Sequence, residues 1–328
     1  GIDHGHIFGM LANMKAQGCT CTQYWTDGPA VTETKFNEVF PELEKVPDRR
    51  RILDDPQVSM VLISAVPADR ADLAIEAMEA GKDVMVDKPG CTTLEQLERV
   101  RAVQARTGRI WSVNFSERFE VPAVARAEAL VFGGAIGRVV QTVGLGPHKQ
   151  NLKTRPPWYF ERPRYGGILC DIGSHQIDQF LWFTGSTSAD VSHALVENTT
   201  LPEHPGFQDY GEMVLRSDKG HGFIRLDWFT ADGLPTWGDG RLFIQGTEGF
   251  IELRKYTDIG RPHVTNSLFL VNGNSNELIP CEDGPLPYFP RLIADVADRT
   301  ETAAPQAHTF LTMELAIRAQ MKAEGQDG

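Results

Sequence analysis

The sequence predicts an α/β protein of two domains, in which a doubly wound parallel sheet is followed by an α+β domain with a large, mainly antiparallel, open sheet. Two observations lead to this prediction. Up to about residue 117, apolar strand-like runs alternate with segments of helical apolar spacing, as in parallel sheets with helices on both faces. Beyond residue 117, strands of alternating apolar and polar residues are joined by short turns, as in antiparallel sheets. Because 328 residues suffice for about two domains, we expect them at 1–117 and 118–328.

The first domain should build its sheet from strands at 19–25, 59–65, 83–86 and 110–115. Two helices with apolar spacing are expected at 69–80 and 94–107, the second opened by Thr92 and Thr93. The chain begins directly on the glycine-rich turn Gly1–Gly9, which in a doubly wound sheet follows the first strand. We therefore expect the first strand to be missing from this domain.

The second domain should begin with a helix at 122–132 and a strand at 139–143, followed by a loop rich in proline and aromatic residues around 155–160. Alternating strands are then expected at 189–196, 210–216, 222–229, 240–244, 250–253 and 268–271, and helices at 289–299 and 308–321. An antiparallel sheet can keep one face open. We expect this face to assemble the protein into a homodimer or homotetramer.

The composition is that of an ordinary globular protein, with 41% hydrophobic and 23% charged residues. The net charge of -12 repels nucleic-acid phosphates and anionic membrane surfaces, so neither partner is expected. No apolar run approaches the roughly 20 residues that span a bilayer, and there is no signal-peptide pattern. The five cysteines lack C-x-x-C spacing, which argues against a disulfide framework or a zinc knuckle. The expected location is a reducing cytoplasm.

The segment Gly166–Asp178 concentrates glycine, carboxylates and an imidazole where a helix should start. Asp171, His175 and Asp178 are spaced by four and three residues, so their side chains should leave one face of that helix. One interpretation is that neutral His175 exchanges a proton with a substrate hydroxyl while Asp171 orients the ring or binds a neighbouring hydroxyl. The other is an ordinary helix in which Asp171 caps the first turn and His175 is a satisfied polar residue.

A second segment, Gly81–Pro89, ends a short apolar strand in Asp87, Lys88 and Pro89. Open α/β sheets place ligand-contacting side chains at such strand ends. Lys88 would offer a positive charge that favours alkoxide character on a reacting hydroxyl. The alternative is a solvated loop lysine.

Together these segments resemble two motifs of the Gfo/Idh/MocA family: Asp87-Lys88-Pro89 is similar to its Glu-Lys-Pro motif, and Gly166–Asp178 to its Gly-Gly-x-x-x-Asp-x-Gly-x-His-x-x-Asp motif. The resemblance implies an N-terminal Rossmann domain that binds NAD or NADP. It also implies hydride transfer between nicotinamide and a hydroxyl-bearing carbon of a sugar, cyclic polyol or derivative, with Lys88, Asp171 and His175 as catalytic residues. An NAD-dependent glycosidase and a non-catalytic nucleotide-binding sensor are the alternatives within this fold.

The dinucleotide turn departs from the usual G-x-G-x-x-G/A fingerprint. With Gly1 as its first glycine, Asp3 and His6 take the second and third glycine positions. Thr26 takes the position of the ribose-binding acid, so NAD against NADP stays open. The predicted cofactor-binding residues are Gly1, Asp3, His4, Gly5, His6, Thr26, Val66, Pro67, Asp87, Lys88 and Asn114. No metal is expected at His4-Gly5-His6, because no other ligand residues stand nearby in sequence.

Substrate contacts are predicted for Arg118, Trp158 and Tyr165, with Tyr159 as a further candidate and Asp171 and His175 contributing as well. The alternative for the aromatic residues is core packing.

Overall fold

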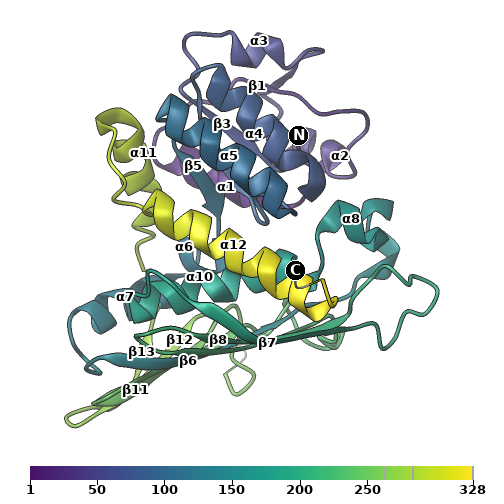
Figure 1. Cartoon of the computed structure of the whole chain (residues 1–328). Helices are drawn as coiled ribbons and strands as arrows, with labels where there is room; N and C mark the ends of the chain where they lie inside the picture. The colour runs from purple at the N-terminus through teal and green to yellow at the C-terminus, as the bar shows by residue number, and fades with distance from the viewer. Residues whose placement is uncertain (262, 283, 327–328) are drawn as a thin grey trace. The chain divides into compact units, whose positions relative to one another are not determined.

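The computed structural model describes residues 1–261, 263–282 and 284–326, which form two compact units (Figure 1). The first unit contains Gly1–Asn114, Pro156–Gly166 and Tyr288–Phe310. The second contains Phe115–Arg155, Gly167–Pro287 and the chain from Leu311 onward. The predicted fold class is confirmed: the first unit holds parallel sheets, and the second holds a large, mainly antiparallel one.

Residues 156–166 and 288–310, which we expected in the second domain, pack with the first unit because specific side chains tie them to it. The Trp111 ring stacks on Phe310 with centroids 5.0 Å apart, and the Trp111 backbone N–H donates to Gln306 at 3.0 Å. Arg164 reaches Asp69 at 3.0 Å. None of these pairs is recognisable from sequence, because the partners lie about a hundred residues or more apart.

The main sheet of the first unit is three-stranded and parallel, in the order β3-β4-β5. The elements of this unit are α1 (His6–Ala16), β1 (Gln23–Tyr24), α2 (Glu33–Val39), β2 (Glu44–Lys45), α3 (Arg50–Leu53), β3 (Met60–Ile63), η1 (Pro67–Asp69), α4 (Arg70–Glu79), β4 (Asp83–Asp87), α5 (Leu94–Thr107), β5 (Trp111–Asn114), η3 (Pro157–Phe160), α8 (Arg162–Tyr165) and α11 (Tyr288–Asp298). Thr93 caps α5 by accepting from Gln96 N at 3.1 Å, and Gly108 ends it in a left-handed conformation.

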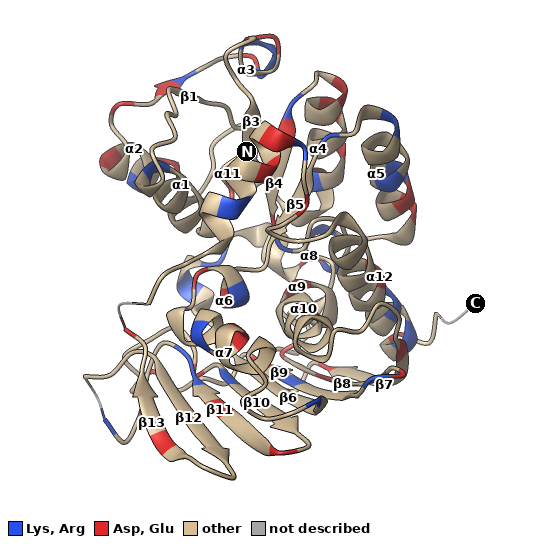
Figure 2. Ribbon diagram, turned by 90° about the vertical axis from the view of Figure 1, so that its left-hand side faces the viewer, with Lys and Arg blue, Asp and Glu red and all other residues tan. Residues whose placement is uncertain are grey.

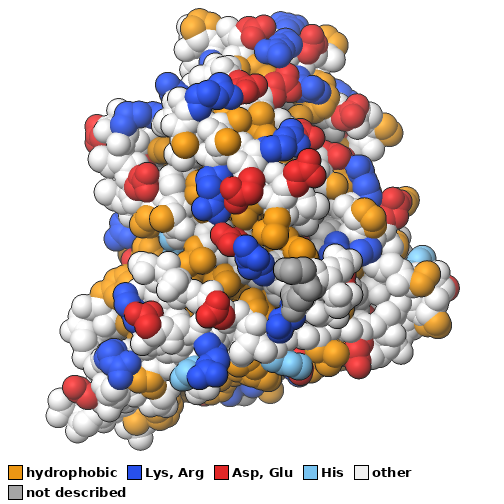
Figure 3. Space-filling view, viewed as in Figure 1, with side chains coloured by type: hydrophobic (Ala, Val, Ile, Leu, Met, Phe, Trp, Pro, Cys, Tyr) orange, Lys and Arg blue, Asp and Glu red, His pale blue; other side chains and the backbone are white. Residues whose placement is uncertain are grey.

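Helix α4 packs on β3 and β4 and lies beside α5, so every residue of β4 is buried. Between the two helices run exposed ion pairs, including Arg99 with Asp72 at 2.6 Å. Acidic and basic side chains are interspersed over the face that Figure 3 displays.

The short strands β1 and β2 form a separate parallel pair. Of the strand expected at 19–25, only Gln23–Tyr24 pairs. A cavity of about 320 Å³ is lined by residues of both β1 and β3. Within the described residues, no strand pairs with both β1 and β3. In a doubly wound sheet, the central strand lies between these two.

The second unit is built on an eight-stranded sheet of order β13-β12-β11-β10-β6-β9-β8-β7, antiparallel except for the parallel pair β6–β9. Its elements are α6 (Ser116–Phe119), α7 (Pro122–Phe132), β6 (Val139–Pro147), η2 (Leu152–Thr154), α9 (Ile168–Asp171), α10 (Gly173–Thr184), β7 (Asp190–Glu197), β8 (Tyr210–Arg216), β9 (His221–Asp227), β10 (Arg241–Gly246), β11 (Gly249–Arg254), β12 (Ser267–Asn272), β13 (Asn276–Pro280) and most of α12 (Gln306–Ala323). Strand β13 was not expected, because its polar residues lack a clear alternation.

Helices α7 and α10 cover one face of this sheet, as Figures 1 and 2 both show. Helix α10 lies close to β6 because the strand carries glycine there: a Cβ on Gly144 would come within 2.5 Å of Gln176 Oε1. Alternate strand residues such as Ile224 and Ile244 are buried beneath the helices. Within the described residues, no helix is both long and apolar enough to cross a bilayer.

Candidate functional site

In the first unit, the carboxyl ends of the parallel strands gather several of the predicted cofactor-binding residues. Asp87 is the last residue of β4 and is in register with Asn114, the last residue of β5. Val66 and Pro67 follow β3, and Lys88 follows Asp87. Because parallel strands end at one edge of a sheet, this edge is the position where open α/β folds bind ligands.

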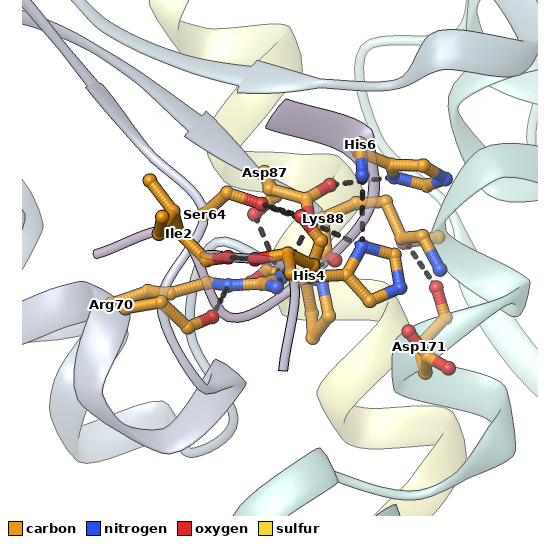
Figure 4. A network of polar contacts seen from close by, with 12 residues as sticks. Ile2, His4, His6, Ser64, Arg70, Asp87, Lys88 and Asp171 are labelled. Atoms are coloured by element: carbon orange, nitrogen blue, oxygen red, sulfur yellow. Dashed lines mark hydrogen bonds and ion pairs between the residues drawn. The ribbon is translucent and has the colours of Figure 1, made fainter. Parts of the chain in front are cut away.

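Asp87 is the centre of a hydrogen-bonded cluster at this edge (Figure 4). Its Oδ1 lies 2.8 Å from His6 Nδ1, and its Oδ2 lies 2.9 Å from His4 Nδ1. Ser64 Oγ donates to Oδ2 at 3.1 Å, and Arg70 donates to it at 2.9 Å. The carboxylate is fully buried and receives four donors, which match its roughly four lone-pair sites.

Arg70, the first residue of α4, fixes the main chain around Lys88. Its fully buried guanidinium donates to the carbonyls of Asp87 at 3.1 Å and Pro89 at 3.2 Å, and also to the Lys88 carbonyl. Its Nε donates to Ala65 O at 2.7 Å. One side chain therefore holds three successive carbonyls at the end of β4. Arg70 and Ser64 were not predicted, because nothing in their local pattern indicates a partner on another strand.

The charges of this cluster stabilise its ionised carboxylate. Burial raises the pKa of Asp87, but Arg70, His6 and His4 outweigh burial and hold the pKa well below its ordinary value. Burial lowers the pKa of His4 to about 4, against the opposing effect of Asp87. His4 is therefore neutral at pH 7 and Asp87 is ionised.

Three potential metal-ligand atoms, from His4, His6 and Asp87, lie within 4.8 Å of one another. The ligand residue that we did not find near His4-Gly5-His6 in sequence is thus Asp87, brought there by the fold. The Arg70 guanidinium 2.9 Å from the same carboxylate places a positive charge where a dication would have to bind. We therefore describe the group as a hydrogen-bonded cluster.

The turn before α1 is held against the end of β3. Ser64 N donates to Gly1 O and His4 N to Ser64 O, both at 3.0 Å. A Cβ on Gly1 would come within 2.6 Å of Ala65, so only glycine fits. Helix α1 begins at His6, with Gly5 as its N-cap. Although Asp3 is their neighbour in sequence, the carboxylate that binds the two imidazoles is that of Asp87. Burial raises the pKa of Asp3.

Thr26, just beyond β1, is buried, and its Oγ1 has no hydrogen-bond partner within the described part of the chain. A buried hydroxyl without a partner costs stability unless a ligand satisfies it. A dinucleotide would supply such a group through a ribose hydroxyl, while the N–H groups at the start of α1 would face its pyrophosphate. The residues of the first unit therefore fit the cofactor that the fold implies.

In the second unit, Asp171 and His175 lie on two successive helices rather than on the single helix expected. Helix α9 ends at Asp171 and α10 starts at Gly173, with Ile172 between them. Both side chains are buried. Spacing alone could not show this interruption, because the separation of four residues is unchanged by it.

Arg118, predicted as a substrate ligand, binds the last acid of the motif. Its Nε and a terminal nitrogen donate to the two carboxylate oxygens of Asp178 at 2.6 and 2.7 Å, and both residues are buried. The guanidinium also lies 4.1 Å from the centroid of a Trp182 ring. Arg118 thus anchors α10, the helix that carries His175. Substrate contact by Arg118 stays a prediction.

A second buried ion pair supports the same helix. Lys255 Nζ lies 2.7 Å from Glu117 Oε2, and Gln176 Nε2 donates to that oxygen at 2.7 Å. Burial raises the pKa of Glu117, but Lys255, with His175 and His148, outweighs burial and lowers it to about 2. Neither Glu117 nor Lys255 was predicted, because the residues are 138 positions apart.

Replacing Glu117 with glutamine is expected to lower the free energy of unfolding at pH 7 by about 3 kcal/mol, since each pKa unit corresponds to about 1.4 kcal/mol. The folded-state pKa lies below the ordinary 4.5, so the carboxylate stabilises the fold above about pH 4.5 and loses this effect as the pH falls toward 2. Urea unfolding at several pH values measures the difference. Glu314→Gln, in an exposed pair with Arg318, is the control. A deficit that does not shrink on acidification contradicts the prediction.

The predicted aromatic residues Trp158, Tyr159 and Tyr165 belong to the first unit. Trp158 and Tyr159 lie with their ring centroids 6.4 and 6.3 Å from that of His4. Tyr159 and Tyr165 are buried and stack on each other, which agrees with the packing alternative for these two. Trp158 is partly exposed beside His4.

Comparison with known proteins identifies the family. Residues 29–115 match the "Oxidoreductase family, NAD-binding Rossmann fold", and residues 124–252 match the "GFO/IDH/MocA C-terminal domain". The chain belongs to the Gfo/Idh/MocA family. The resemblance inferred from Asp87-Lys88-Pro89 and Gly166–Asp178 is thus confirmed.

Individual Gfo/Idh/MocA relatives carry the names of dehydrogenases. The chain is 29% identical to scyllo-inositol 2-dehydrogenase (NAD(+)) of Bacillus subtilis over 71% of its length and 64% of that protein. It is 34% identical to levoglucosan dehydrogenase of Pseudarthrobacter phenanthrenivorans, over 53% of its length and 44% of that protein. It thus spans less than two thirds of these curated relatives. A crystal structure of an oxidoreductase from Erwinia carotovora atroseptica is 41% identical with a TM-score of 0.94, covering 98% of this chain and 97% of that one.

Proposed function

We propose that this protein is an NAD(P)-dependent oxidoreductase that acts on a hydroxyl-bearing carbon of a sugar, cyclic polyol or derivative. The observation that carries the proposal is the position of Lys88 at the carboxyl edge of the parallel sheet, where Arg70 binds its main-chain carbonyl. The family to which the chain belongs is an NAD-binding oxidoreductase family. The named relatives oxidise scyllo-inositol and levoglucosan, which supports this substrate class.

In this proposal each predicted catalytic residue has one role. Lys88 stabilises the negative charge that develops on the substrate oxygen. His175 accepts the hydroxyl proton, and Asp171 orients His175 or a neighbouring hydroxyl. The bound nicotinamide supplies the hydride chemistry. Gly1, Asp3, His4, Gly5, His6, Thr26, Val66, Pro67, Asp87 and Asn114 remain the proposed cofactor-binding residues, and Arg118, Trp158 and Tyr165 the proposed substrate-binding residues.

A screen of sugars and polyols, including scyllo-inositol and levoglucosan, tests this proposal. Each compound is incubated with NAD and with NADP in parallel, and reduced nicotinamide is followed by absorbance. Accumulation of reduced cofactor in step with substrate consumption supports an oxidoreductase. Release of sugar from glycosides without net change in the cofactor would identify a glycosidase instead. Cofactor binding without turnover of any compound would identify a sensor.

We further propose that the open face of the eight-stranded sheet joins subunits into a homodimer or homotetramer. On this face, apolar residues in direct register form a row from Val214 through Phe223 and Val143 to Phe243. Glu252 on β11 and then Phe269 on β12 continue the register beyond Phe243. Phe223 is 37% exposed on this face, while the next residue of β9, Ile224, points to the opposite face and is buried. Apolar rows of this kind are typical of interfaces between subunits.

Phe243→Glu is expected to convert the assembly to monomers, because a second carboxylate in register with Glu252 would lose its hydration in the interface. Light scattering after size-exclusion chromatography measures the mass. Phe132→Glu is the matched control: Phe132 is 59% exposed on α7, outside the row. A wild-type monomer, or an F243E variant with unchanged mass, contradicts the proposed interface.

The proposed compartment is a reducing cytoplasm. None of the five cysteines, Cys19, Cys21, Cys91, Cys170 and Cys281, takes part in a disulfide in the described structure. Proteins of reducing compartments usually lack disulfides.

A further inference from the structure

The two ring nitrogens of His4 have different surroundings: Nδ1 contacts Asp87, and Nε2 points away from it (Figure 4). Its Nδ1 lies 2.9 Å from Asp87 Oδ2, while its side chain is still 14% exposed. Figure 4 shows the ring lying beside Asp87, with its second ring nitrogen directed away from the carboxylate. Two groups compete for Nδ1: the His6 main-chain N–H lies 3.4 Å from it, and the Asp87 carboxylate lies closer, at 2.9 Å. Since the ionised Asp87 can only accept, the shorter contact places the hydrogen on Nδ1 and leaves Nε2 with a lone pair.

The surroundings of His4 keep the ring neutral. It is packed edge-on against His6, with ring centroids 4.4 Å apart, and the charge of Lys88 acts against its protonation. Burial lowers its pKa to about 4 despite Asp87. A neutral ring with Nδ1–H bonded to a carboxylate offers an acceptor of fixed direction at Nε2.

The neighbourhood of this acceptor suits a sugar. The partly exposed Trp158, with its ring centroid 6.4 Å from that of His4, provides aromatic surface beside the imidazole. The buried Tyr159, at 6.3 Å and 24°, packs against the His4 ring and supports it. Lys88 lies at the end of the same strand as Asp87. Aromatic faces, a cation and a neutral acceptor together match the apolar C–H faces and the hydroxyl groups of a sugar ring.

We propose that His4 Nε2 accepts a hydrogen bond from a sugar hydroxyl, with Asp87 fixing the tautomer that makes this possible. The inference rests on the proposed oxidoreductase function for the presence of such a ligand. The hydroxyl belongs either to a ribose of the dinucleotide or to the substrate, and the experiment below separates these two sources. His4 is thereby assigned a ligand-binding contact that the glycine-based fingerprint would not contain.

The tautomer is measured first, by long-range ¹H–¹⁵N correlation NMR of the whole protein at pH 7. The expected result is a neutral His4 ring protonated at Nδ1. An Nε2–H tautomer or a doubly protonated ring overturns the inference. The Asp87→Asn variant should change the tautomer population, because an amide can also donate to the ring nitrogen.

Ligand binding is then compared for wild type, His4→Asn and His4→Gln. Asparagine can donate to Asp87 from a position near Nδ1 but lacks an acceptor at the place of Nε2. Glutamine places an amide oxygen near Nε2. We expect His4→Asn to weaken ligand binding about tenfold, and His4→Gln to recover part of this loss.

Two measurements distinguish the sources of the hydroxyl. Calorimetry with ADP-ribose reports the dinucleotide ribose, and the KM of the substrate found in the screen reports the substrate. A change in either one in His4→Asn supports the inference and names the source. The control is His193→Asn, which removes an exposed histidine that pairs with Glu212 at 3.1 Å on the sheet of the second unit.

Unchanged ADP-ribose affinity together with unchanged KM in His4→Asn overturns the inference. The outcome for the proposed function is separate. If ADP-ribose binds and depends on His4 but no compound is turned over, the oxidoreductase proposal fails and the His4 contact stands. If ADP-ribose does not bind at all and no substrate is found, both fail.

Discussion

Replacing Lys88 with methionine is expected to lower kcat by roughly 10²- to 10³-fold, the usual effect of removing one group that stabilises charge in the transition state. Methionine keeps most of the apolar stem and removes the ammonium. Lys88 is 2% exposed, and its main chain is fixed by Arg70, so the substitution changes charge at a rigid position. Steady-state kinetics with the substrate from the screen gives kcat and KM.

The control for Lys88→Met is Lys82→Met, at the other end of the same segment. Lys82 is also buried, at 6% exposure, and its Nζ donates to Asp55 O at 2.6 Å. Its loss should affect stability and leave kcat nearly unchanged. Equal kcat in wild type and Lys88→Met removes Lys88 from the chemistry. A decrease confined to cofactor affinity would make Lys88 a binding residue only.

Replacing Arg70 with methionine is expected to lower the free energy of unfolding by about 3–5 kcal/mol, the cost of removing one partner from a buried ion pair. The Asp87 carboxylate would keep His4, His6 and Ser64 as donors but lose its cation, and four carbonyls would lose their donor. Chemical denaturation measures this change. We also expect kcat to fall, because the main chain at Lys88 would be released.

Arg99→Met provides the contrast for Arg70→Met. Arg99 binds Asp72 at 2.6 Å, but its side chain is 49% exposed, and such surface pairs contribute about 1 kcal/mol or less. Similar losses in Arg70→Met and Arg99→Met would show that the cluster around Asp87 does not stabilise the fold. The double variant Arg70→Met with Asp87→Asn should be less destabilised than the sum of the single variants, because the two residues act as a pair.

Local pattern was sufficient for the elements whose residues carry their own signal. The helices expected at 69–80 and 94–107 correspond to α4 and α5, since apolar spacing and the Thr93 cap are properties of neighbouring residues. The strand at 83–86 corresponds to β4, whose three central residues, 84–86, are apolar because both sheet faces are covered. The short elements β2 and α2 were not predicted, because a segment of two or seven residues is too short to show a clear apolar period.

The sequence by itself determined the alternation of strands and helices, the two motifs, and with them the family and the identity of Lys88, Asp171 and His175 as candidates. Only the tertiary structure decided which groups those residues depend on. Asp87 draws its donors from positions 4, 6, 64 and 70, and Glu117 its cation from position 255. Such contacts form only when strands and helices that are distant in sequence pack together. The free energy of a buried charge depends on these packed neighbours rather than on the residues beside it in the chain.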